Sequence, residues 1–382
     1  MDDRNSVKNN IAAAIAFCIF LAVVPLFLIF LPDKDFSGAE KRVLSQRPEL
    51  SLGSALDGSF ESDVEKYIQD QIPLRNAFVG IGSYFDRLIG KNGADGIISG
   101  KDGYLFNTPV VFNKDSLDIN LSLLNNFSDN VKTDNYIMIV PSAGYMLEDK
   151  LPAVHETYRD KEILDYISDS VLGKYAFVDI TDALSRSSET NQIFYRTDHH
   201  WTSAGAYAAY REFAGHAGYD ALSEDMFVKE YIDGFHGTTY SKSALWFKKP
   251  DRMELWTYPE SDITVKITDI GSEKTTTSDS LFFKDGLEKY DMYPVYLDGN
   301  HSLTEITNDS VKDGTLLIIK DSYANTLATL LADSFHRVLM VDLRYYRTES
   351  VSGLIEEYGV DKLLVLYGID NIINDTNLIW LK

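Results

Sequence analysis

Short apolar runs alternate with helical patterns through most of the chain. From about residue 117 onward, segments with apolar residues at helical spacing separate these runs. Short apolar strands that alternate with helices are typical of a parallel sheet covered on both faces. The pattern therefore predicts an α/β fold. The expected strands are 136–140, 175–180, 315–320, 338–341 and 362–366, and the expected helices are 117–131, 160–173, 203–217, 324–333 and 351–358.

The segment of about residues 225–310 departs from this pattern. Within it, residues 253–258 and 263–267 alternate apolar or β-branched side chains with polar ones. A period of two is typical of antiparallel strands with one buried face. We therefore expect a β-rich insertion in the α/β domain.

Residues 11–31 carry no charged side chain. A helix rises about 1.5 Å per residue, so this stretch is long enough to cross a hydrocarbon core of about 30 Å. Its length, and the lack of a small-residue cleavage site after it, favour an uncleaved signal-anchor over a cleaved signal peptide or a buried core helix. Arg4 and Lys8 precede the stretch, which favours a single-pass cell-membrane protein with a cytoplasmic N-terminus and an extracytoplasmic main domain.

These patterns divide the chain into three parts. Residues 1–35 hold the cytoplasmic N-terminus and the transmembrane helix. Residues 36–110 form a connecting segment with amphipathic helices, which we expect to pack on the main domain. Residues 111–382 form the α/β domain with its β-rich insertion.

Composition narrows the classes of function. Asp and Glu total 58 against 36 Lys and Arg, so the formal net charge is -22 at pH 7. That charge repels polyanions, and we expect no nucleic acid partner. The single cysteine, Cys18, excludes a disulfide within the chain. The sequence has no glycine-rich phosphate-binding loop, and we expect no cofactor.

Asp198, His199, His200 and Trp201 place an acid, two imidazoles and an indole side by side in a chain with only seven histidines. Asp198 and His200 are two residues apart, so on an extended loop both side chains lie on the same side. A carboxylate there can hold one imidazole nitrogen while the other nitrogen faces a nucleophile. The segment therefore predicts the acid and the base of a serine-hydrolase triad.

Ser322 is the predicted nucleophile. It ends the Lys-Asp-Ser sequence that follows the four apolar residues 316–319, and a helical segment comes next, so it would sit at the carboxyl end of a parallel strand, where open α/β sheets bind ligands. The N–H groups and partial positive charge of a helix N-terminus also stabilise an oxyanion there. A serine that only caps the helix explains the same position. Because a serine hydroxyl needs a base and an orienting acid, we favour a catalytic triad of Ser322, His200 and Asp198, with no metal.

Together the two segments resemble a known family. Thr-Asp-His-His-Trp-Thr at 197–202, with Lys-Asp-Ser-Tyr at 320–323, is similar to the DHHW family of exported proteins, which is related to the SGNH-hydrolase-like acetyltransferases that O-acetylate alginate. Further matches lie at 70–75, 100–105, 235–243 and 341–346. The resemblance covers roughly residues 36–382 and implies an SGNH-hydrolase-like parallel sheet with permuted block order, because the Asp-His block precedes the serine block. It places the catalytic triad on the same three residues.

The resemblance also implies groups that bind the oxyanion or the substrate. The backbone N–H of Ser322 or Tyr323 would hold the oxyanion. Arg344 matches an arginine near the oxyanion site in relatives, where the alternative is a surface arginine paired with an acid. Asn371 follows a strand at a place where SGNH enzymes carry an oxyanion asparagine, where the alternative is a plain turn. The serine block reads Lys-Asp-Ser where hydrolases have Gly-Asp-Ser, which leaves the nucleophile in place.

The expected function is that of an extracytoplasmic serine-dependent O-acetyltransferase that modifies a cell-wall or exported polysaccharide through an acyl-enzyme. The family association implies a membrane-bound O-acyltransferase as the partner that supplies acetyl groups. Two alternatives share the fold: a carbohydrate acetylesterase with the same triad, and a non-catalytic polysaccharide-binding or assembly protein. Metal-dependent phosphoesterases also use Asp-His-His segments, but they need further Asp motifs at upstream strand ends that this chain lacks.

Overall fold

The computed structural model describes residues 10–12, 14, 15, 17, 18, 26–28, 30–272 and 274–381. Much of the predicted transmembrane segment, 11–31, lies outside the described residues. Among the residues that are described, no helix is both long and apolar enough to span a membrane. The membrane anchor therefore stays a prediction. The chain forms two compact units, one of Met1–Lys91 with Ala244–Trp246 and one of Asn92–Ser243 with Phe247–Lys382.

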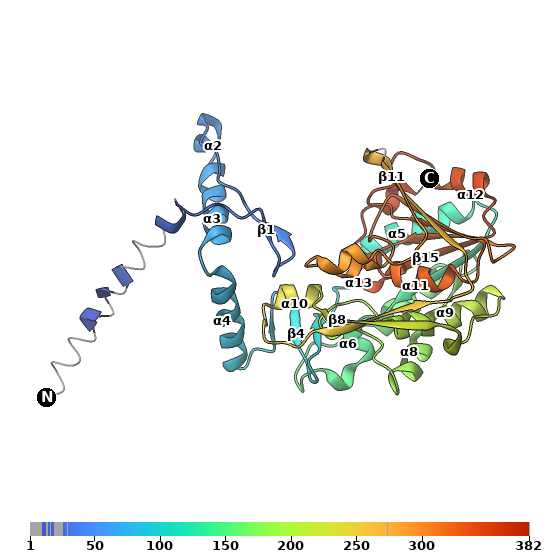
Figure 1. Cartoon of the computed structure of the whole chain (residues 1–382), viewed down its shortest axis with the longest axis horizontal. Helices are drawn as coiled ribbons and strands as arrows, with labels where there is room; N and C mark the ends of the chain where they lie inside the picture. The colour runs from blue at the N-terminus through green and yellow to red at the C-terminus, as the bar shows by residue number, and fades with distance from the viewer. Residues whose placement is uncertain are drawn as a thin grey trace. The chain divides into compact units, whose positions relative to one another are not determined.

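In the smaller unit, residues 36–91 form three helices and one short antiparallel pair of strands (Figure 1). These elements are β1 (Phe36–Ser37), β2 (Arg42–Val43), α2 (Leu52–Leu56), α3 (Ser59–Gln71) and α4 (Arg75–Leu88). Asp70 in α3 accepts two hydrogen bonds from the Arg42 guanidinium, at 2.9 and 2.5 Å, and one from the Ser45 N–H at 2.8 Å. The hydrogen bonding from Arg42 lowers the pKa of Asp70 to about 2. An ion pair thus joins β2 to the end of α3.

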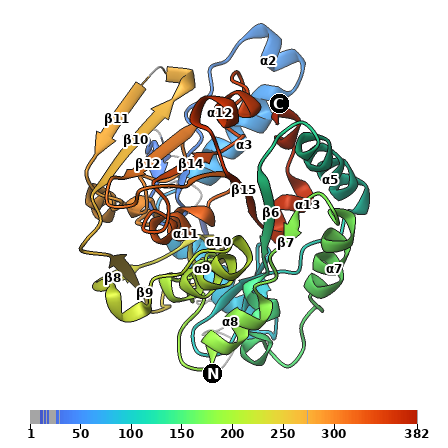
Figure 2. The same cartoon turned by 90° about the vertical axis from the view of Figure 1, so that its right-hand side faces the viewer.

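An eight-stranded sheet forms the centre of the larger unit, in the order β11-β10-β12-β14-β13-β15-β6-β7 (Figure 2). Its parallel strands are β6 (Asp134–Val140), β7 (Ala176–Phe177), β13 (Thr315–Lys320), β14 (Arg337–Val341) and β15 (Lys362–Gly368). The sheet continues beyond β14 with the antiparallel strands β12 (Leu303–Asn308), β10 (Ile263–Asp269) and β11 (Lys274–Ser278). The predicted α/β fold with a largely parallel sheet is confirmed.

The parallel strands follow a permuted doubly wound order. The strands can be renumbered 1 to 5 by starting at β13 and placing β6 and β7, which come earlier in the chain, after β15. The order across the sheet, β14-β13-β15-β6-β7, then reads 2-1-3-4-5. In sheets of this order, ligands bind outside the carboxyl end of the first strand, where the winding direction reverses. Ser322 comes almost directly after β13, so it lies at this switch point.

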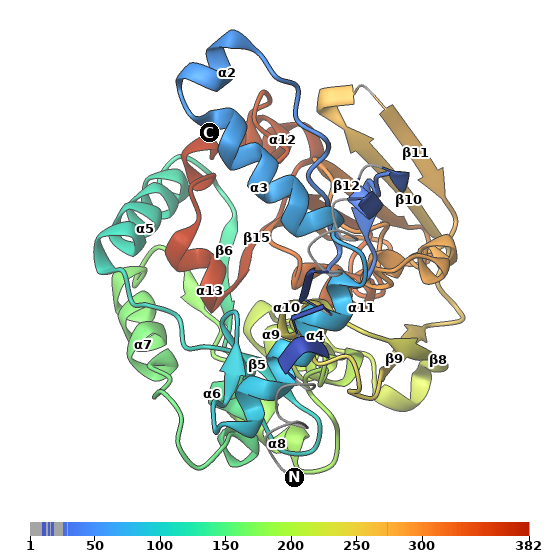
Figure 3. The same cartoon turned by 90° about the vertical axis from the view of Figure 1, so that its left-hand side faces the viewer.

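Side chains along each parallel strand alternate between two hydrophobic cores. In β13, Leu316 and Ile318 face one core, whereas Leu317 and Ile319 face the other. All four are fully buried, and burial of one such side chain contributes about 1.5–3 kcal/mol. Helices α8 (Thr181–Ser188), α9 (Ser203–Ala217) and α11 (Ala324–Leu331) cover the first core, and α5 (Lys114–Ser128), α7 (Asp160–Ser170), α12 (Val351–Tyr358) and α13 (Ile369–Asn374) cover the second (Figures 2 and 3).

The predicted β-rich insertion does not form one separate body. β8 (Val228–Phe235) pairs with β9 (Asp251–Thr257) as an antiparallel ribbon, whereas β10, β11 and β12 join the central sheet. Val265 of β10 and Ile306 of β12 are buried in the same core as α9, which explains why these strands extend the sheet. The strands predicted at 253–258 and 263–267 are confirmed.

Residues 92–110 are part of the larger unit, although the sequence pattern placed them in the connecting segment. Backbone hydrogen bonds attach residues 92–110 to the larger unit: the Lys101 N–H donates to the Lys150 carbonyl at 2.7 Å, and the Leu105 N–H to the Arg196 carbonyl at 2.8 Å.

The remaining elements of the larger unit are β3 (Gly93–Ala94), β4 (Ile97–Ser99), β5 (Leu105–Asn107), α6 (Ala143–Met146), α10 (Thr238–Ser243) and 3-10 turns at Glu148–Lys150, Glu224–Met226, Ile270–Ser272, Lys284–Glu288, Tyr293–Val295 and Leu378–Trp380.

Candidate active site

Asp198, His200 and Ser322 form one line of hydrogen bonds. The Nδ1 of His200 lies 2.5 Å from Asp198 Oδ1, and its Nε2 lies 2.8 Å from Ser322 Oγ. Asp198 and His200 are buried, with 2% and 4% of their surface exposed, whereas Ser322 is half-buried. Opposite ring nitrogens thus connect the acid and the hydroxyl, which is the arrangement that lets an imidazole take a serine proton.

A tight loop positions the acid and the base. The Tyr195 N–H donates to the His200 carbonyl at 3.1 Å, which closes the loop. The His200 N–H donates to Asp198 Oδ1 at 3.0 Å, so the carboxylate fixes the turn as well as the ring. Trp201 is fully buried, and its indole N–H donates to the Tyr323 carbonyl at 3.1 Å. This last bond ties the loop to the turn that carries the serine.

The Asp198 carboxylate is held ionised by its surroundings. Its Oδ2 accepts hydrogen bonds from the Thr238 N–H at 2.6 Å and the Thr238 hydroxyl at 3.0 Å. Burial raises the pKa of Asp198, but the imidazoles of His199 and His200 and these hydrogen bonds outweigh burial and hold the pKa well below its usual range. Gly237 packs so closely that a Cβ there would lie 2.1 Å from the Asp198 Cβ. Position 237 therefore requires glycine.

Tyr293 stacks on the imidazole of His200, with ring centroids 3.8 Å apart and ring planes 11° from parallel. Its hydroxyl donates to the Ser322 carbonyl at 3.3 Å, and burial raises the pKa of Tyr293, so the phenol stays neutral. An aromatic face beside an imidazole favours the charged imidazolium. Sequence reasoning missed Tyr293, because nothing in its local pattern separates it from the chain's 22 other tyrosines (23 in total).

Asp321 organises the turn that carries Ser322. Its carboxylate accepts the Tyr323 N–H at 2.9 Å, the Gly368 N–H at 2.7 Å and the Asn371 side-chain amide at 2.7 Å. Burial raises the pKa of Asp321, and these three hydrogen bonds oppose that rise. The Tyr323 N–H and the Asn371 amide, both predicted to bind the oxyanion or the substrate, are thus already bonded to a carboxylate.

The Ser322 N–H donates no hydrogen bond to the residues that the structure describes, so it can serve an oxyanion. The Ser322 carbonyl accepts the Asn325 N–H at 3.3 Å, which fixes the turn. Tyr323, not Ser322, is the N-cap residue of α11, and the Ser322 hydroxyl bonds to His200 instead. The geometry therefore favours the nucleophile position over the capping alternative.

Arg344 is held by an acid. Its guanidinium donates to both oxygens of Asp342, at 2.8 and 2.5 Å, and this hydrogen bonding raises the pKa of Arg344. Arg344 also lines a cavity of about 190 Å³ at the carboxyl edge of the sheet, together with Lys320, Asp321 and Asn371. The structure thus brings Arg344 and Asn371 to one cavity beside the serine turn.

Lys320 lies two residues before Ser322 and is buried. Its ammonium donates to Asn300 Oδ1 at 2.7 Å and to Asn325 Oδ1 at 2.6 Å, and it lies 4.0 Å from Asp342 Oδ2. Burial lowers the pKa of Lys320 to about 8, although Asp342 attracts the proton. The Lys-Asp-Ser sequence thus places a buried ammonium next to the serine turn.

Asp251 of β9 supports the loop that carries Asp198. Its buried carboxylate accepts the N–H groups of Arg196 and Thr197 at 3.0 and 2.8 Å, the Thr197 hydroxyl at 2.6 Å and the Gln192 amide at 2.9 Å. Sequence reasoning did not identify Asp251, because its partners lie more than fifty residues earlier in the chain.

Asp198, His199 and His200 each have a donor atom within 4.8 Å of the others, a spacing that could hold a metal ion. In the structure these donors are engaged. His200 bonds to Asp198 and Ser322, and His199 Nδ1 lies 2.8 Å from the Thr238 hydroxyl. A metal ion would displace these hydrogen bonds, so the geometry favours the triad.

Comparisons with known proteins place the chain among relatives. The family model described as DHHW protein matches residues 99–341. A DHHW family protein from Eubacterium siraeum has a TM-score of 0.64 and 23% identity, covering 74% of this chain and 94% of that chain. Bacillus cereus PatB1 with a sulfonyl adduct has a TM-score of 0.63 and 19% identity, covering 75% of this chain and 100% of that chain.

More distant comparisons add little. The O-acetyltransferase domain of Pseudomonas putida AlgJ has a TM-score of 0.48 and 14% identity, covering 75% of this chain and 95% of that chain, a similarity too low to support an inference. Comparison with curated protein sequences found no match. The family model nevertheless covers more than half of the sequence, and this chain belongs to the DHHW family.

Proposed function

We propose that this chain is an extracytoplasmic serine O-acetyltransferase that acetylates a cell-wall or exported polysaccharide through an acyl-enzyme. The observation that carries the proposal is the hydrogen-bonded line from Asp198 through His200 to Ser322. Membership of the DHHW family and a fold shared with PatB1 support it. The position of Ser322 at the switch point of the sheet supports it as well.

Acylation begins when Ser322 Oγ attacks the carbonyl carbon of an acetyl donor. His200 Nε2 takes the hydroxyl proton, and Asp198 stabilises the imidazolium through Nδ1. The Ser322 N–H donates to the oxyanion, with Arg344 in the neighbouring cavity as a second candidate donor. His200 then gives the proton to the leaving group, the bond from carbon to the leaving group breaks, and acetyl-Ser322 remains.

Transfer repeats these steps with a sugar hydroxyl. His200 takes the proton of the acceptor hydroxyl, whose oxygen attacks the acetyl carbonyl of acetyl-Ser322. The bond to Ser322 Oγ breaks, and His200 returns the proton to that oxygen. An esterase differs only in that water is the acceptor.

The acceptor is what separates the proposed transferase from an acetylesterase. The association of the DHHW family with membrane-bound O-acyltransferases favours transfer, with such a partner delivering the acetyl group across the membrane. An anchor at 11–31 would hold the α/β domain near that partner.

The test is incubation of the full-length chain with 4-nitrophenyl acetate, followed by intact-mass analysis and peptide mapping. We expect a gain of one acetyl group, located on Ser322. Ser322→Ala should lose it, and Ser272→Ala, at an exposed serine of the same unit, should keep it. A folded protein whose acetyl group lies on another residue, or a folded Ser322→Ala variant that releases 4-nitrophenol at the wild-type rate, contradicts the mechanism.

A second measurement distinguishes transferase from esterase. Acetyl-Ser322 formed from the same donor is mixed with water alone or with a polysaccharide acceptor. Faster loss of the adduct with acetyl ester appearing on the glycan supports transfer, whereas an unchanged rate with free acetate supports an esterase. Stoichiometric manganese or zinc that protects Asp198 and His200 from modification would instead support the metal alternative.

A further inference from the structure

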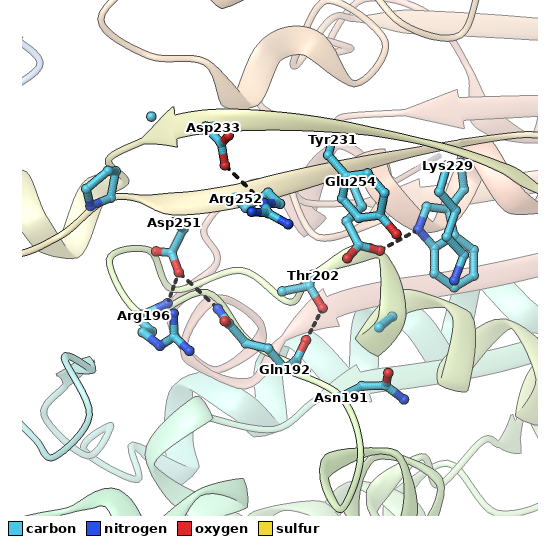
Figure 4. Close-up of a pocket in the computed structure, with 14 residues that line it drawn as sticks. Asn191, Gln192, Arg196, Thr202, Lys229, Tyr231, Asp233, Asp251, Arg252 and Glu254 are labelled. Carbon is cyan, nitrogen blue, oxygen red and sulfur yellow. Dashed lines mark hydrogen bonds and ion pairs between the residues drawn. The ribbon is translucent and has the colours of Figure 1, made fainter.

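A cavity of about 680 Å³ lies between the β8–β9 ribbon and the segment that leads into the Asp-His-His-Trp loop. Figure 4 shows Tyr231, Arg252 and Glu254 on the two strands, opposite Gln192 and Arg196 of that segment. Its volume is within the range of about 300–1,000 Å³ that is typical of small-ligand pockets. The triad does not line this cavity, and the mechanism above does not use it.

The side chains of the cavity match the chemistry of a saccharide. Sugars present pairs of hydroxyl groups that both donate and accept, together with faces of C–H groups. Planar amide, carboxylate and guanidinium groups at Gln192, Glu254 and Arg252 can bond to hydroxyl pairs. Tyr231 has 53% of its surface exposed and offers an aromatic face for the C–H groups.

Arg196 adds a cation without an acidic partner. Lys229 pairs with Glu224 at 2.6 Å, and Arg252 pairs with Asp233 at 3.0 Å. The Arg196 guanidinium has no ion pair with any residue that the structure describes, and its Nε is buried without a hydrogen-bond partner. A half-buried guanidinium of this kind matches a carboxylate or a phosphate, which it can bind with two parallel hydrogen bonds.

Asp251, the acid next to Arg196, already accepts hydrogen bonds from other groups. Both oxygens of Asp251 accept hydrogen bonds from the Arg196 and Thr197 backbone, the Thr197 hydroxyl and the Gln192 amide. Asp251 therefore holds the backbone of Arg196, whereas the Arg196 guanidinium lies 5.8 Å from the centroid of the Tyr104 ring and lines the cavity without an acidic partner among the described residues. In a chain with a net charge of -22, an unpaired arginine in a polar cavity marks a site for an anionic group.

We propose that this cavity binds an acidic sugar unit of the acceptor polysaccharide, with Arg196 paired to its carboxylate or phosphate and Tyr231 packed against its ring. The identification of the ligand as part of the acceptor rests on the proposed function. Arg196 and Thr202, which both line the cavity, flank the Asp198–Trp201 loop in sequence. A bound sugar thus contacts the same loop that holds the acid and the base.

The test is isothermal titration calorimetry with the full-length chain and three probes: a trisaccharide of galacturonic acid, a neutral maltotriose and glucose 1-phosphate. We expect the uronate or the sugar phosphate to bind at least tenfold more tightly than maltotriose, and the better of the two identifies the anion. Arg196→Gln should reduce that affinity at least tenfold, and Arg196→Lys, which keeps the charge, should restore part of it. Arg211→Gln, at an exposed arginine of α9, should not change it.

Tyr231→Ala provides a second variant at an exposed position that should not disturb folding, and it should weaken all three probes. Equal affinity for acidic and neutral sugars, or no effect of Arg196→Gln in a protein of unchanged thermal stability, overturns the proposal. Titrations repeated in Ser322→Ala, together with the acetylation assay of the wild type, separate the sugar-binding cavity from the proposed acetyltransferase activity. Acidic-sugar binding without any acetyl-Ser322 in the wild type refutes the proposed function alone, and acetyl-Ser322 without such binding refutes the cavity alone.

Discussion

Asp251→Asn is the substitution that tests most directly how the fold positions the catalytic acid. Asp251 Oδ1 accepts the Arg196 N–H and the Gln192 amide, and Oδ2 accepts the N–H and the hydroxyl of Thr197. Asparagine keeps the size of the side chain but replaces one of the two oxygens with an NH₂ group. Whichever way the new amide turns, one backbone N–H next to Asp198 loses its acceptor.

The loss of stability in Asp251→Asn follows from the burial of the groups that Asp251 bonds. Thr197 has none of its surface exposed and Asp251 has 2%, so water does not replace the lost acceptor. A buried donor without a partner costs about 1–3 kcal/mol, and the remaining hydrogen bonds lose the strength that a charged acceptor adds. We therefore expect the larger unit to lose about 2–4 kcal/mol of stability, which lowers its thermal unfolding midpoint by roughly 5–10 °C.

Activity should fall as well, because Arg196 and Thr197 directly precede Asp198. A displacement of about 1 Å at a catalytic group costs on the order of 100-fold in rate. The assay is the single-turnover rate of acetylation by 4-nitrophenyl acetate, measured at a temperature where the variant is folded. This donor is small and does not need the saccharide cavity.

Asp233→Asn is the matched control. Asp233 lies on the paired strand, 81% of its side chain is exposed, and its ion pair is with Arg252. We expect it to change stability by no more than about 0.5 kcal/mol. If Asp251→Asn unfolds at the wild-type temperature and acetylates at the wild-type rate, the Asp251 carboxylate does not hold the loop and the reasoning is wrong.

Three further predictions test the neighbouring contacts. Gly237→Ala places a Cβ where only 2.1 Å separates it from the Asp198 Cβ, so single-turnover acetylation should fall about 100-fold; a wild-type rate would show that the contact is not needed. Tyr293→Leu removes the ring stacked on His200 and should slow acetylation about tenfold, whereas Tyr293→Phe keeps the ring and should lose less; equal losses would rule out the stacking role. The pKa of Lys320 is about 8 in the folded chain and about 10.5 in the unfolded chain, so the unfolded chain binds more protons between these two pH values. The free energy of unfolding of the wild type should therefore rise by about 2–3 kcal/mol from pH 8 to pH 10.5. Urea unfolding of Lys320→Met should lack this rise, and identical pH profiles of the two proteins would contradict the buried ammonium.

Local sequence was sufficient to predict most helices and strands of the larger unit. The helix predicted at 203–217 is α9, Ser203–Ala217. Its N-cap Thr202 accepts the Gly205 N–H at 3.3 Å, and Gly218 ends it with a φ of 74°. These signals lie within one turn of the helix ends, so no long-range contact is needed to read them. The strand predicted at 175–180 shortens to β7, because at the sheet edge only Ala176 and Phe177 pair with β6.

The hypothesis that Asp198 and His200 act with Ser322 also came from sequence, although His200 and Ser322 are 122 residues apart. Local patterns identified each of the two segments, and the chemical complementarity of their side chains and the resemblance to a family connected them. The structure supplies the distances, and the catalytic role stays a proposal until acetyl-Ser322 is observed.

The sequence by itself thus determined the α/β pattern and the chemistry of the triad residues, whereas the tertiary structure decided which groups around them are free to act. Asp321 accepts the Tyr323 N–H and one of the two N–H groups of the Asn371 amide, two groups that the family resemblance had assigned to the oxyanion. Asp251 supports the site by accepting the N–H of Thr197, 54 residues earlier in the chain. Tyr293 supports it by donating to the carbonyl of Ser322, 29 residues later. Periodicity encodes which face of a helix or strand is buried, but whether a donor is free depends on the acceptor that the folded chain brings beside it.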